Sequence, residues 1–549
     1  MKKKMLAAVL GATMILGVGL TGCGSGTADF DKIPVLGAIE TQTPEEIATL
    51  MAKSSQKDSF IIDAGKLNLD PTYLYDSGTE LYSIYEMLFQ VAGGLGSDMV
   101  PTLADGSKGD PSTPGYSHVA GSSEYTIFIQ DNIYDHAGNH FTASDAVFSF
   151  QKTVEGQCTS GWDVVNEWVA TSDYVVTMKC KRELTNKGEF ENIVLRCFMF
   201  TEKAYNDGKV GTTTACGTGP YKLKSYTSGS SCVVEKYADY WAVNSKNRQR
   251  GQYANVNTIT VRLIEDETSR YLNVTGGDTD MSQNVPANYL AQTENSGLTV
   301  AALPGNDLAY LEANMSGNSP VSNDLNLRLA IFYAISSADM AQYMGGEAYN
   351  SVACFGCTVF PDYNTDWESW KNYQTSDSAE GLEKAKEYLA ASNYKGQELV
   401  IICATTTGPD FVEAVLEKYL NIQCKIKVST TIDTDLVSGK SWDLYYNSGV
   451  RASDYLANMW SHVMNASAFS GGVTEGRYDS SEYQALLQKC LSENATQSDM
   501  NAFWQATLDN ALVEGLYSPV TYVAYSSSVV TDVWLNDKSV FLPGAFIYA

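Results

Sequence analysis

The chain has 549 residues, of which 64 are Asp or Glu and 37 are Lys or Arg, so its formal net charge is −27. This excess of negative charge argues against nucleic acid or anionic lipid as a binding partner, because both carry the same sign of charge. Hydrophobic residues make up 44% of the chain, as in globular proteins, and the length exceeds what one hydrophobic core usually supports. We therefore expect two or three compact units.

The first 23 residues have the pattern of an export signal. Three lysines at positions 2–4 precede an apolar run at 5–19, which is shorter than the roughly 20 residues that cross a bilayer. The following Leu-Thr-Gly-Cys, ending at Cys23, resembles the signal of bacterial lipoproteins. Residues 1–22 would then be removed, and lipid on Cys23 would anchor the protein to the outer face of the cytoplasmic membrane, on the periplasmic side if the cell has an outer membrane. An ordinary cleaved signal with a chance cysteine is the alternative.

Residues 23–57 are mixed polar sequence and are expected to form a tether, so the folded body should begin near residue 58. A strand is predicted around 60–62 and a helix over 81–89, where apolar residues recur with helical spacing. Residues 125–129 alternate as a strand. Thr142 and Asp145 have the spacing of a capping box at the start of a helix.

The second part of the chain continues this mixture of strands and helices. A hairpin is predicted over 221–226 and 232–237, and another strand over 258–264. Strand 398–403, helix 410–420 and strand 425–429 form a βαβ unit, which requires a parallel sheet covered by helices. Two further amphipathic helices should contain residues 483–490 and 503–512. The fold class is therefore α/β with mixed sheets.

Catalytic and metal-binding patterns are sparse. The sequence lacks G-x-S-x-G, Walker and HExxH motifs. Cys354 and Cys357 have C-x-x-C spacing without a second pair, which indicates a loop, disulfide-closed or not, rather than a zinc or redox site. His136 and His140 flank a turn rather than a helical turn that would align two ligands. We expect no enzyme activity, no cofactor and no metal site.

A series of ordered phrases is more specific than any of these patterns. They are PTLAD at 101–105, TASDAVFSF at 142–150, GTGPYKL at 217–223, DYW at 239–241, ITV at 259–261 and the stretch 311–335 with Asp324 and Arg328. The series resembles the family-5 extracellular solute-binding proteins, the oligopeptide, dipeptide and nickel-binding receptors of ABC importers. The phrases themselves have a structural interpretation, with glycines in turns and Tyr and Trp in packing.

The resemblance implies a class II periplasmic-binding-protein fold, a likeness that extends over nearly the whole mature chain. Lobe I would be built from 58–88, 216–312 and 515–549, an extra domain II from 89–215, and lobe II from 313–514. A monomer would close its two lobes around a solute and deliver it to ABC permease subunits.

The resemblance also implies ligand-binding residues. In peptide-binding relatives an Asp in the phrase sGWgaDYpDP holds the ligand amine, and the matching region, 448–455, makes Asp454 the anchor. The chain lacks the Trp of this phrase and has Leu-Ala in place of Asp-Pro, which leaves the ligand class open, and Asp454 could instead cap the following helix. Arg451 could pair with a ligand carboxylate or be a surface residue. Trp442, Tyr446 and Trp460 could line the cleft or belong to the scaffold.

Three more residues complete the predicted site. Thr79 and Glu80 belong to an early loop that contacts the ligand backbone in relatives, although polar loop residues also form plain turns. Tyr310 lies near the expected hinge. Peptide is the favoured solute, and the alternatives are a nickel chelate or sugar-like compound bound by the same fold, or an exported hydrolase.

Overall fold

The computed structural model describes most of the chain from residue 58 onward. The segments not described are residues 1–57, 74–77, 92–98, 157–161, 185–186, 246–247, 250–251, 253, 255, 284, 287–288, 290–292, 294–295, 305–306, 347–348, 352–355, 357–362, 371–372, 374–377, 452–455, 467–474, 493–494, 527–528, 531–533, 537–538, 542–545 and 548–549. The export signal, Cys23, the tether and Asp454 therefore lie outside the described residues.

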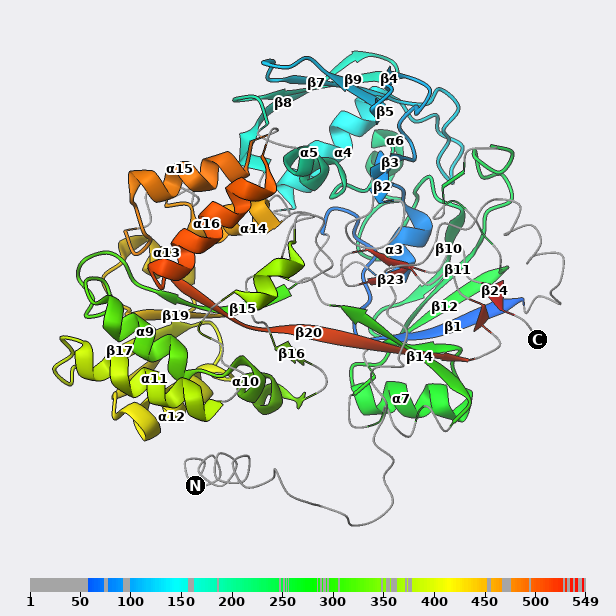
Figure 1. Cartoon of the computed structure of the whole chain (residues 1–549). Coiled ribbons are helices and arrows are strands. Elements are labelled where there is room, and N and C mark those ends of the chain that lie inside the picture. The colour runs from blue at the N-terminus through cyan, green and yellow to red at the C-terminus, as the bar shows by residue number, and fades with distance from the viewer. Residues whose placement is uncertain are drawn as a thin grey trace.

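One long mixed sheet forms the centre of the molecule (Figure 1). Its main path is, in order, β10 (Tyr221–Thr227), β11 (Ser231–Lys236), β12 (Thr258–Leu263), β1 (Ser59–Ala64), β13 (Met281–Ser282), β20 (Val513–Ser526), β15 (Asp307–Ala313), β19 (Leu444–Arg451), β17 (Leu399–Cys403) and β18 (Cys424–Val428). Off this path, β14 (Leu298–Pro304) and β16 (Tyr349–Ser351) both pair with β20. Strand β20 joins two parts that we call the first half-sheet, from β10 to β13 with β14, and the second half-sheet, from β15 to β18 with β16.

The first half-sheet contains the predicted hairpin and strands. β10 and β11 pair antiparallel, and β1 runs parallel to both β12 and β13. Two helices accompany it, α3 (Thr79–Ile84) and α7 (Glu267–Gly276). Its core includes Phe60, Ile62, Tyr221 and Val261, all almost fully buried.

The predicted helix over 81–89 is too long and begins too late. Helix α3 ends at Ile84, and Tyr85 has an extended backbone with φ −114° and ψ 145°. The amide of Gly219 donates to the Ile84 carbonyl at 2.8 Å, which removes the acceptor that the next helical turn would use. A Cβ on Gly217 or Gly219 would come within 2.2 to 2.6 Å of the carbonyl oxygens at the end of α3, so only glycine allows this approach.

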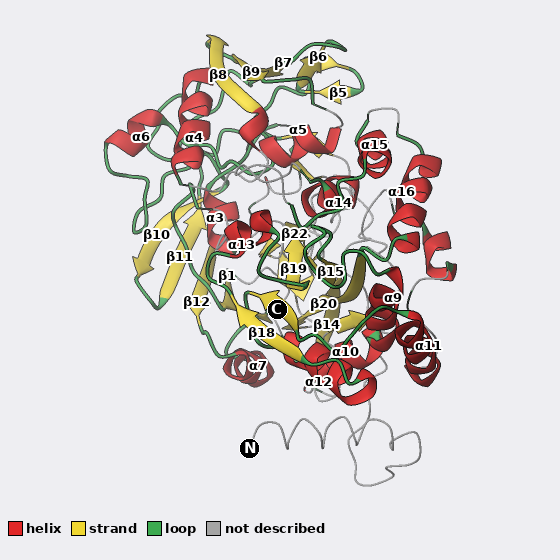
Figure 2. Cartoon of the chain, turned by 90° about the vertical axis from the view of Figure 1, so that its left-hand side faces the viewer, coloured by secondary structure: helices red, strands yellow, loops and turns green. Residues whose placement is uncertain are grey.

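The second half-sheet is covered by helices on both faces, as the βαβ interpretation requires. β17 and β18 are parallel and are connected through α12 (Pro409–Leu420). One face carries α9 (Leu325–Ala334), α10 (Ser337–Met344), α11 (Ser378–Ala391) and α12, and we call this the lower layer. The other face carries α13 (Ile432–Ser438), α14 (Leu456–Met464), α15 (Ser481–Cys490), α16 (Gln497–Asp509) and the 3-10 helix Thr365–Ser369, and we call this the upper layer. Figures 1 and 2 both place α9–α12 and α14–α16 on opposite sides of the strands.

Side chains of this half-sheet alternate between the two layers. On β15, Leu311 packs in the lower layer and Tyr310 in the upper layer. On β19, Tyr446 packs in the lower layer and Tyr445 in the upper layer. A strand buried on both faces can carry large apolar side chains at every position, which explains the density of aromatic residues here.

A peripheral unit, formed by the described residues between 89 and 199, has its own sheet and core. Its strands are, in order, β6 (Tyr116–His118), β7 (Glu124–Phe128), β9 (Val175–Cys180) and β8 (Val165–Ser172), with the short pairs β2 (Phe89–Val91) and β3 (Met99–Pro101), and β4 (Gly109–Asp110) and β5 (Thr113–Pro114). Its helices are α4 (Ala143–Glu155), α5 (Lys187–Val194) and the 3-10 helix Trp162–Val164, with α6 (Glu202–Asn206) following. The predicted start of α4 is confirmed, because the amide and hydroxyl of Thr142 both donate to Asp145 Oδ2, at 2.8 and 2.9 Å.

The C-terminal end forms two short antiparallel pairs, β21 (Val529–Val530) with β24 (Phe546–Ile547) and β22 (Trp534–Asn536) with β23 (Ser539–Phe541). Seven described cysteines are buried and form no disulfide: Cys180, Cys197, Cys216, Cys232, Cys403, Cys424 and Cys490. Cys354 and Cys357 lie outside the described residues.

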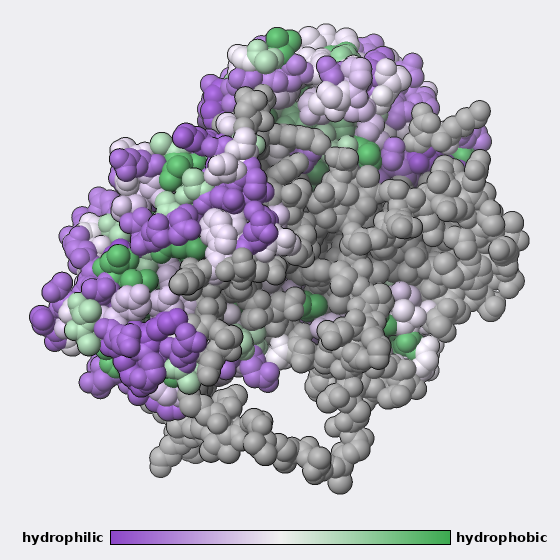
Figure 3. Space-filling model, in the orientation of Figure 1, coloured by the Kyte–Doolittle hydropathy of each residue, from purple (hydrophilic) through white to green (hydrophobic). Residues whose placement is uncertain are grey.

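The described surface in Figure 3 is mainly hydrophilic over the second half-sheet and the peripheral unit, with small separate apolar patches. None of the helices in the described part of the chain is both long and apolar enough to cross a membrane.

Candidate functional site

The two half-sheets meet where β20 exchanges partners. Its first part pairs with β15 and its last part with β14, so two connected strands, β14 and β15, both lie against one continuous strand. The exchange takes place between Tyr517, which is opposite Ala309, and Val520, which is opposite Pro304. Pro519 lies between these two residues. Because proline has no backbone N–H, β20 can make fewer hydrogen bonds at the point where it passes from one half-sheet to the other.

Bulges in two neighbouring strands flank the same point of β15. On one side, Tyr310 is opposite Asn447 and Leu308 is opposite Val450, so Ser448 and Gly449 of β19 together face a single residue. On the other side, the register of β20 also shifts between Ala309 and Tyr310. Bulges bend a strand, increase its twist and are enriched next to binding and active sites. The bulges in β19 and β20 therefore bend the sheet at the strand crossover.

One edge of β19 is open beyond this bend. β17 pairs with β19 only at Leu444 and Tyr445, while β15 accompanies β19 as far as Arg451. Among the strands that the structure describes, none pairs with the other edge of residues 446–451, and Ser448 and Gly449 are exposed. An open strand edge can pair with an extended backbone, as in β-strand addition.

Tyr310 is opposite Asn447, next to the open edge of β19, and its side chain packs in the upper layer. Its side chain is 2% exposed, and its ring centroid is 5.8 Å from Tyr445 and 6.4 Å from Trp460. Burial raises the pKa of Tyr310 well above its ordinary value, so its hydroxyl is a neutral donor and acceptor. The amide Nδ2 of Asn447 donates to this hydroxyl at 3.2 Å.

The three aromatic residues predicted for the cleft are packed inside the second half-sheet. Trp442, Tyr446 and Trp460 are 3%, 1% and 1% exposed. The Tyr446 hydroxyl is 2.7 Å from that of Tyr517 in the lower layer, and Trp442 lies against Gly476 in the upper layer. They support the strands around the open edge in this structure, and their direct contact with a ligand stays a prediction.

The two charged candidates are only partly described. Arg451 is the last residue of β19, and only its backbone is described. Asp454 lies in the segment 452–455 between β19 and α14, outside the described residues. The predicted anchor therefore follows β19 in the sequence, three positions after its last residue.

Thr79 and Glu80 are buried at the start of α3, not exposed on a loop. Both are almost fully buried, and Glu80 Oε1 accepts the amide of Asn68 at 2.9 Å. Glu80 Oε2 has no hydrogen-bond partner among the described residues. Burial is the main cause that raises the pKa of Glu80 to about 7.

This burial gives a pH-dependent contribution to stability. The folded pKa of Glu80, about 7, exceeds its unfolded value of 4.5, so between these values the folded state binds more protons and the free energy of unfolding falls as pH rises. Glu80→Gln removes this titration. We expect the stability of the variant relative to the native protein to rise by up to about 3 kcal/mol between pH 5 and pH 8. Urea unfolding of both proteins across this range measures the difference, and a difference independent of pH would contradict the assignment.

The DYW phrase and Gln252 converge on one buried carboxylate after α3, that of Glu86, which local patterns do not reveal. Glu86 Oε1 accepts from the Tyr240 hydroxyl and from Gln252 Nε2, both at 2.7 Å, and Oε2 accepts from Trp241 Nε1 at 2.9 Å. The Glu86 carbonyl accepts the amide of Met199 at 2.8 Å. Burial raises the pKa of Glu86 although these side-chain donors oppose the shift. The DYW phrase thus has a polar role as well as a packing role.

A second buried charge lies beside the bend. Glu312 of β15 and Arg477 are each 3% exposed, with Arg477 Nε 3.6 Å from Glu312 Oε1. Burial raises the pKa of Glu312 to about 7, and the charge of Arg477 opposes the shift. Arg477 Nη1 also donates at 3.0 Å to the carbonyl of Asn465, directly after α14. The pair therefore connects β15 to the helix that follows the predicted anchor segment.

Asp324 and Arg328, from the last signature phrase, fix elements rather than bind ligand. Asp324 accepts the amide of Leu327 at the start of α9 and the amide of Asn393 after α11. The Arg328 guanidinium donates twice to the carbonyl of Asn510, at 3.0 and 2.9 Å, where α16 ends before β20. Arg328 therefore holds the entry to β20, and Asp324 fixes the start of α9, the helix that carries Arg328.

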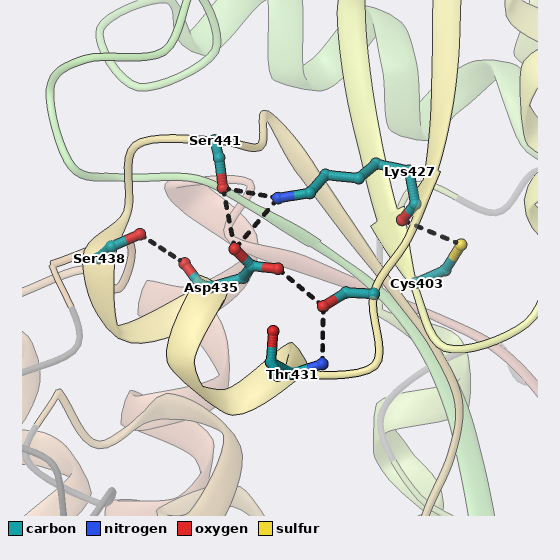
Figure 4. A network of polar contacts seen from close by, with 7 residues as sticks. Cys403, Lys427, Thr431, Asp435, Ser438 and Ser441 are labelled. Carbon is teal, nitrogen blue, oxygen red and sulfur yellow. Dashed lines mark hydrogen bonds and ion pairs between the residues drawn. The ribbon is translucent and has the colours of Figure 1, made fainter.

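A further polar network holds the segment between β18 and β19 (Figure 4). Lys427 Nζ donates to Asp435 Oδ1 at 3.1 Å and to Ser441 Oγ at 3.0 Å, and Ser429 Oγ donates to Asp435 Oδ2 at 2.7 Å. The hydrogen bond from Ser429, helped by Lys427, lowers the pKa of Asp435. These side chains satisfy one another, so the network ties α13 to β18.

Metal donors do not gather in the described part of the chain, where no group of three or more His, Cys, Asp or Glu side chains could hold an ion. Nε2 of His136 is 2.9 Å from the Gly219 carbonyl, and Nε2 of His140 is 2.8 Å from the Asp131 carbonyl. Burial lowers the pKa of His136 to about 4, so this ring is neutral and bridges the peripheral unit to the GTGPY loop.

The family model of bacterial extracellular solute-binding proteins, family 5, matches residues 99–463. The chain is similar to the nickel-binding protein NikA of Staphylococcus aureus, with 23% identity over 426 residues that cover 75% of this chain and 79% of NikA. Among solved structures it is similar to a putative peptide-binding protein AppA of Clostridium difficile, with a TM-score of 0.71, 17% identity and coverage of 89% and 100%. It is also similar to DppA of Helicobacter pylori in complex with the peptide STSA, with a TM-score of 0.66, 19% identity and coverage of 91% and 100%. The α/β fold predicted from the sequence is confirmed by these structures.

Proposed function

The chain belongs to the family 5 bacterial extracellular solute-binding proteins, and from this premise we propose that it captures a peptide between its two lobes and delivers it to the permease of an ABC importer. The open edge of β19 next to the strand crossover is the observation that carries the proposal. A peptide in an extended conformation has the backbone donors and acceptors that such an edge lacks. Members of this family are transport receptors, and the proposed protein leaves its ligand chemically unchanged.

The lobes of this proposal follow the predicted division of the chain. Lobe I would be 58–88, 216–312 and 515–549, domain II 89–215 and lobe II 313–514. The separate cores of the described residues, one around β1 and β12, one in the peripheral unit and two on the faces of the second half-sheet, support a division into these units. The side chains of β15 pack in the cores of the second half-sheet, so the boundary between lobes I and II would lie before β15 rather than at residue 312. Closure would bend β14, β15 and β20 at the crossover.

The predicted anchors complete the proposed site. Asp454 would bind the peptide amine and Arg451 its carboxylate, because Arg451 is the last residue of β19 and Asp454 follows it by three positions in the sequence. Charge-assisted hydrogen bonds contribute about 1.5 to 3 kcal/mol each, whereas micromolar affinity needs about 8 kcal/mol, so the strand edge must supply the rest. At the N-terminus, lipid on Cys23 would keep this monomeric receptor at the outer face of the membrane.

A nickel complex is the second candidate, because a relative that matches this chain over 426 residues is named a nickel-binding protein. A thermal-shift screen separates the candidates by offering a tryptic digest of casein, nickel with excess L-histidine, and maltooligosaccharides. A ligand at 100 times its dissociation constant adds about 2.7 kcal/mol of stability, which raises the unfolding midpoint. We expect a shift with the digest, and a shift with nickel–histidine alone would replace the peptide by a metal chelate.

Asp454→Ala tests the anchor in the same assay. We expect binding of the casein peptides to weaken at least tenfold, with an unchanged midpoint in the absence of peptide, since one charge-assisted hydrogen bond is lost. Isothermal calorimetry on a peptide isolated from the complex gives the affinity. Equal affinity of variant and native protein would exclude Asp454 as the anchor.

A further inference from the structure

Two side chains control the shape of the open strand end. Ser448 and Gly449 are opposite a single residue of β15, so they cannot both form the regular backbone hydrogen bonds with that strand. Other contacts must therefore fix their conformation. Oδ1 of Asn447 accepts the Gly449 amide at 3.0 Å, a local turn bond that spans the bulge. The remaining polar end of Asn447, Nδ2, donates to Tyr310.

Tyr310 is itself held in place by the upper layer. Its ring meets Tyr445 edge-on, with an interplanar angle of 89°, and Trp460 at 63°. Tyr310 is only 2% exposed and packs in the core, whereas Ser448 and Gly449 are exposed. A chain of contacts therefore runs from the core through Tyr310 and Asn447 to the bulge.

We propose that Tyr310 and Asn447 form a positioning pair, which fixes the bulge of β19 in the shape that a ligand backbone meets. Tyr310 acts through Asn447 and does not touch the ligand. This inference rests on the proposed function, because the open edge of β19 is the ligand-binding edge of that proposal. An edge that is already ordered costs less conformational entropy on binding than one that a ligand must order.

The pair makes a specific prediction about coupling. Tyr310→Phe and Asn447→Ala should each weaken peptide binding about 5- to 10-fold, the size of one or two hydrogen bonds. The double variant should bind no more than about twofold more weakly than Asn447→Ala, because both changes break the same chain of contacts. Asn447→Ser, whose hydroxyl can still accept the Gly449 amide, should recover part of the loss.

The matched control is Tyr483→Phe. The Tyr483 hydroxyl is also buried in the upper layer and is 2.8 Å from Thr507 Oγ1, but its partner lies on α16, away from β19. This variant should lose as much thermal stability as Tyr310→Phe and bind peptide like the native protein. Equal loss of binding in both tyrosine variants would overturn the positioning role.

The experiment combines affinity for casein tryptic peptides with hydrogen–deuterium exchange of the free protein. Asn447→Ala and Tyr310→Phe should speed exchange in the peptide covering 444–451 and leave 481–490 unchanged, whereas Tyr483→Phe should do the reverse. Unchanged exchange at 444–451, or losses of affinity that multiply in the double variant, would overturn the proposal. If the native protein binds no peptide, the proposed function fails, and the exchange result still decides whether the pair fixes the bulge.

Discussion

Replacing Arg477 by Gln is expected to lower the free energy of unfolding by about 3 to 5 kcal/mol at pH 7.5. The change leaves Glu312, 3% exposed, without the cation 3.6 Å away, and Glu312 Oε2 already has no hydrogen-bond partner among the described residues. It also frees the carbonyl of Asn465 at the end of α14. A buried charge that loses its partner must be protonated or hydrated at the expense of the folded state.

The double variant Glu312→Leu with Arg477→Met removes both charges. Comparing its free energy of unfolding with that of Arg477→Gln distinguishes the destabilisation caused by an unpaired buried charge from the net contribution of the ion pair. Apolar replacement of a buried ion pair is often neutral or stabilising, so we expect the double variant to recover most of the lost stability. The control is Arg182→Gln, which breaks the ion pair with Glu189 at 2.7 Å, where the Arg182 side chain is 49% exposed. Screening by water should keep that loss below about 1 kcal/mol. Urea unfolding of the four proteins measures the series, and a loss at Arg477 no larger than at Arg182 would contradict the argument.

The pH profile of the same series provides an independent check. Arg477 lowers the raised pKa of Glu312, so its removal should leave Glu312 protonated at higher pH. Native Glu312 already holds its proton up to its folded pKa of about 7, so the destabilisation of Arg477→Gln should be nearly constant from pH 5 to about pH 7 and grow above that pH, where the native carboxyl ionises and the variant carboxyl does not. A loss of packing alone would have no such pH dependence.

Local features of this fold could be predicted because neighbouring residues determine them. The capping box of Thr142 and Asp145 depends on a spacing of three residues, and the hairpin of β10 and β11 on a turn between two alternating strands. The βαβ unit around α12 could be predicted from a short apolar strand, an amphipathic helix and a second strand. These signals need no knowledge of distant residues.

The site could be predicted less well, because its geometry depends on partners far apart in the chain. Glu86 meets Tyr240, Trp241 and Gln252 across separations of 154 to 166 residues, and no periodicity marks it. The end of α3 is likewise set by the docking of Gly219, more than 130 residues away. The family resemblance led us to expect Tyr310 near a hinge, but its partner Asn447 follows only from the register of β15 and β19.

The aromatic candidates show a different difficulty. The βαβ interpretation of lobe II implies strands covered on both faces, and such strands bury large apolar side chains at successive positions. Tyr445 and Tyr446 accordingly point into opposite layers, and neither faces solvent. The polar, exposed end of the strand, Ser448 and Gly449, was the better indicator of an accessible edge.

Replacing Glu86 by Ala is expected to destabilise the protein by about 3 to 6 kcal/mol. Two buried donors, from Tyr240 and Gln252, and one half-buried donor, from Trp241, lose their acceptor, and each unsatisfied buried donor costs about 1 to 3 kcal/mol. Water entering the space left by the side chain offsets part of this cost. Glu155→Ala, which removes an exposed glutamate of α4, should change stability by less than about 0.5 kcal/mol.

Intermediate variants separate hydrogen bonding from packing at this position. Tyr240→Phe removes one donor and keeps the ring, so its loss should be about 1 to 2 kcal/mol. Glu86→Gln keeps the shape but points an amide N–H at one of the donors, and its loss should lie between those of Tyr240→Phe and Glu86→Ala. Urea denaturation followed by tryptophan fluorescence measures all four variants, and a loss for Glu86→Gln as small as for Glu155→Ala would show that shape alone matters.

Glu86 contacts two parts of the chain, so hydrogen exchange near it tests its role as directly as the free energy of unfolding does. Its backbone carbonyl accepts the amide of Met199 of the peripheral unit, and its carboxylate accepts from Tyr240, Trp241 and Gln252, which follow the hairpin of the first half-sheet, so residue Glu86 connects these two parts of the chain. Glu86→Ala should therefore speed hydrogen exchange at residues 197–201 and 237–243 before the sheet itself opens. Faster exchange spread evenly over β1 and β12 instead would mean that Glu86 stabilises the first half-sheet as a whole, and that the joint to the peripheral unit depends on other contacts, such as His136 against Gly219.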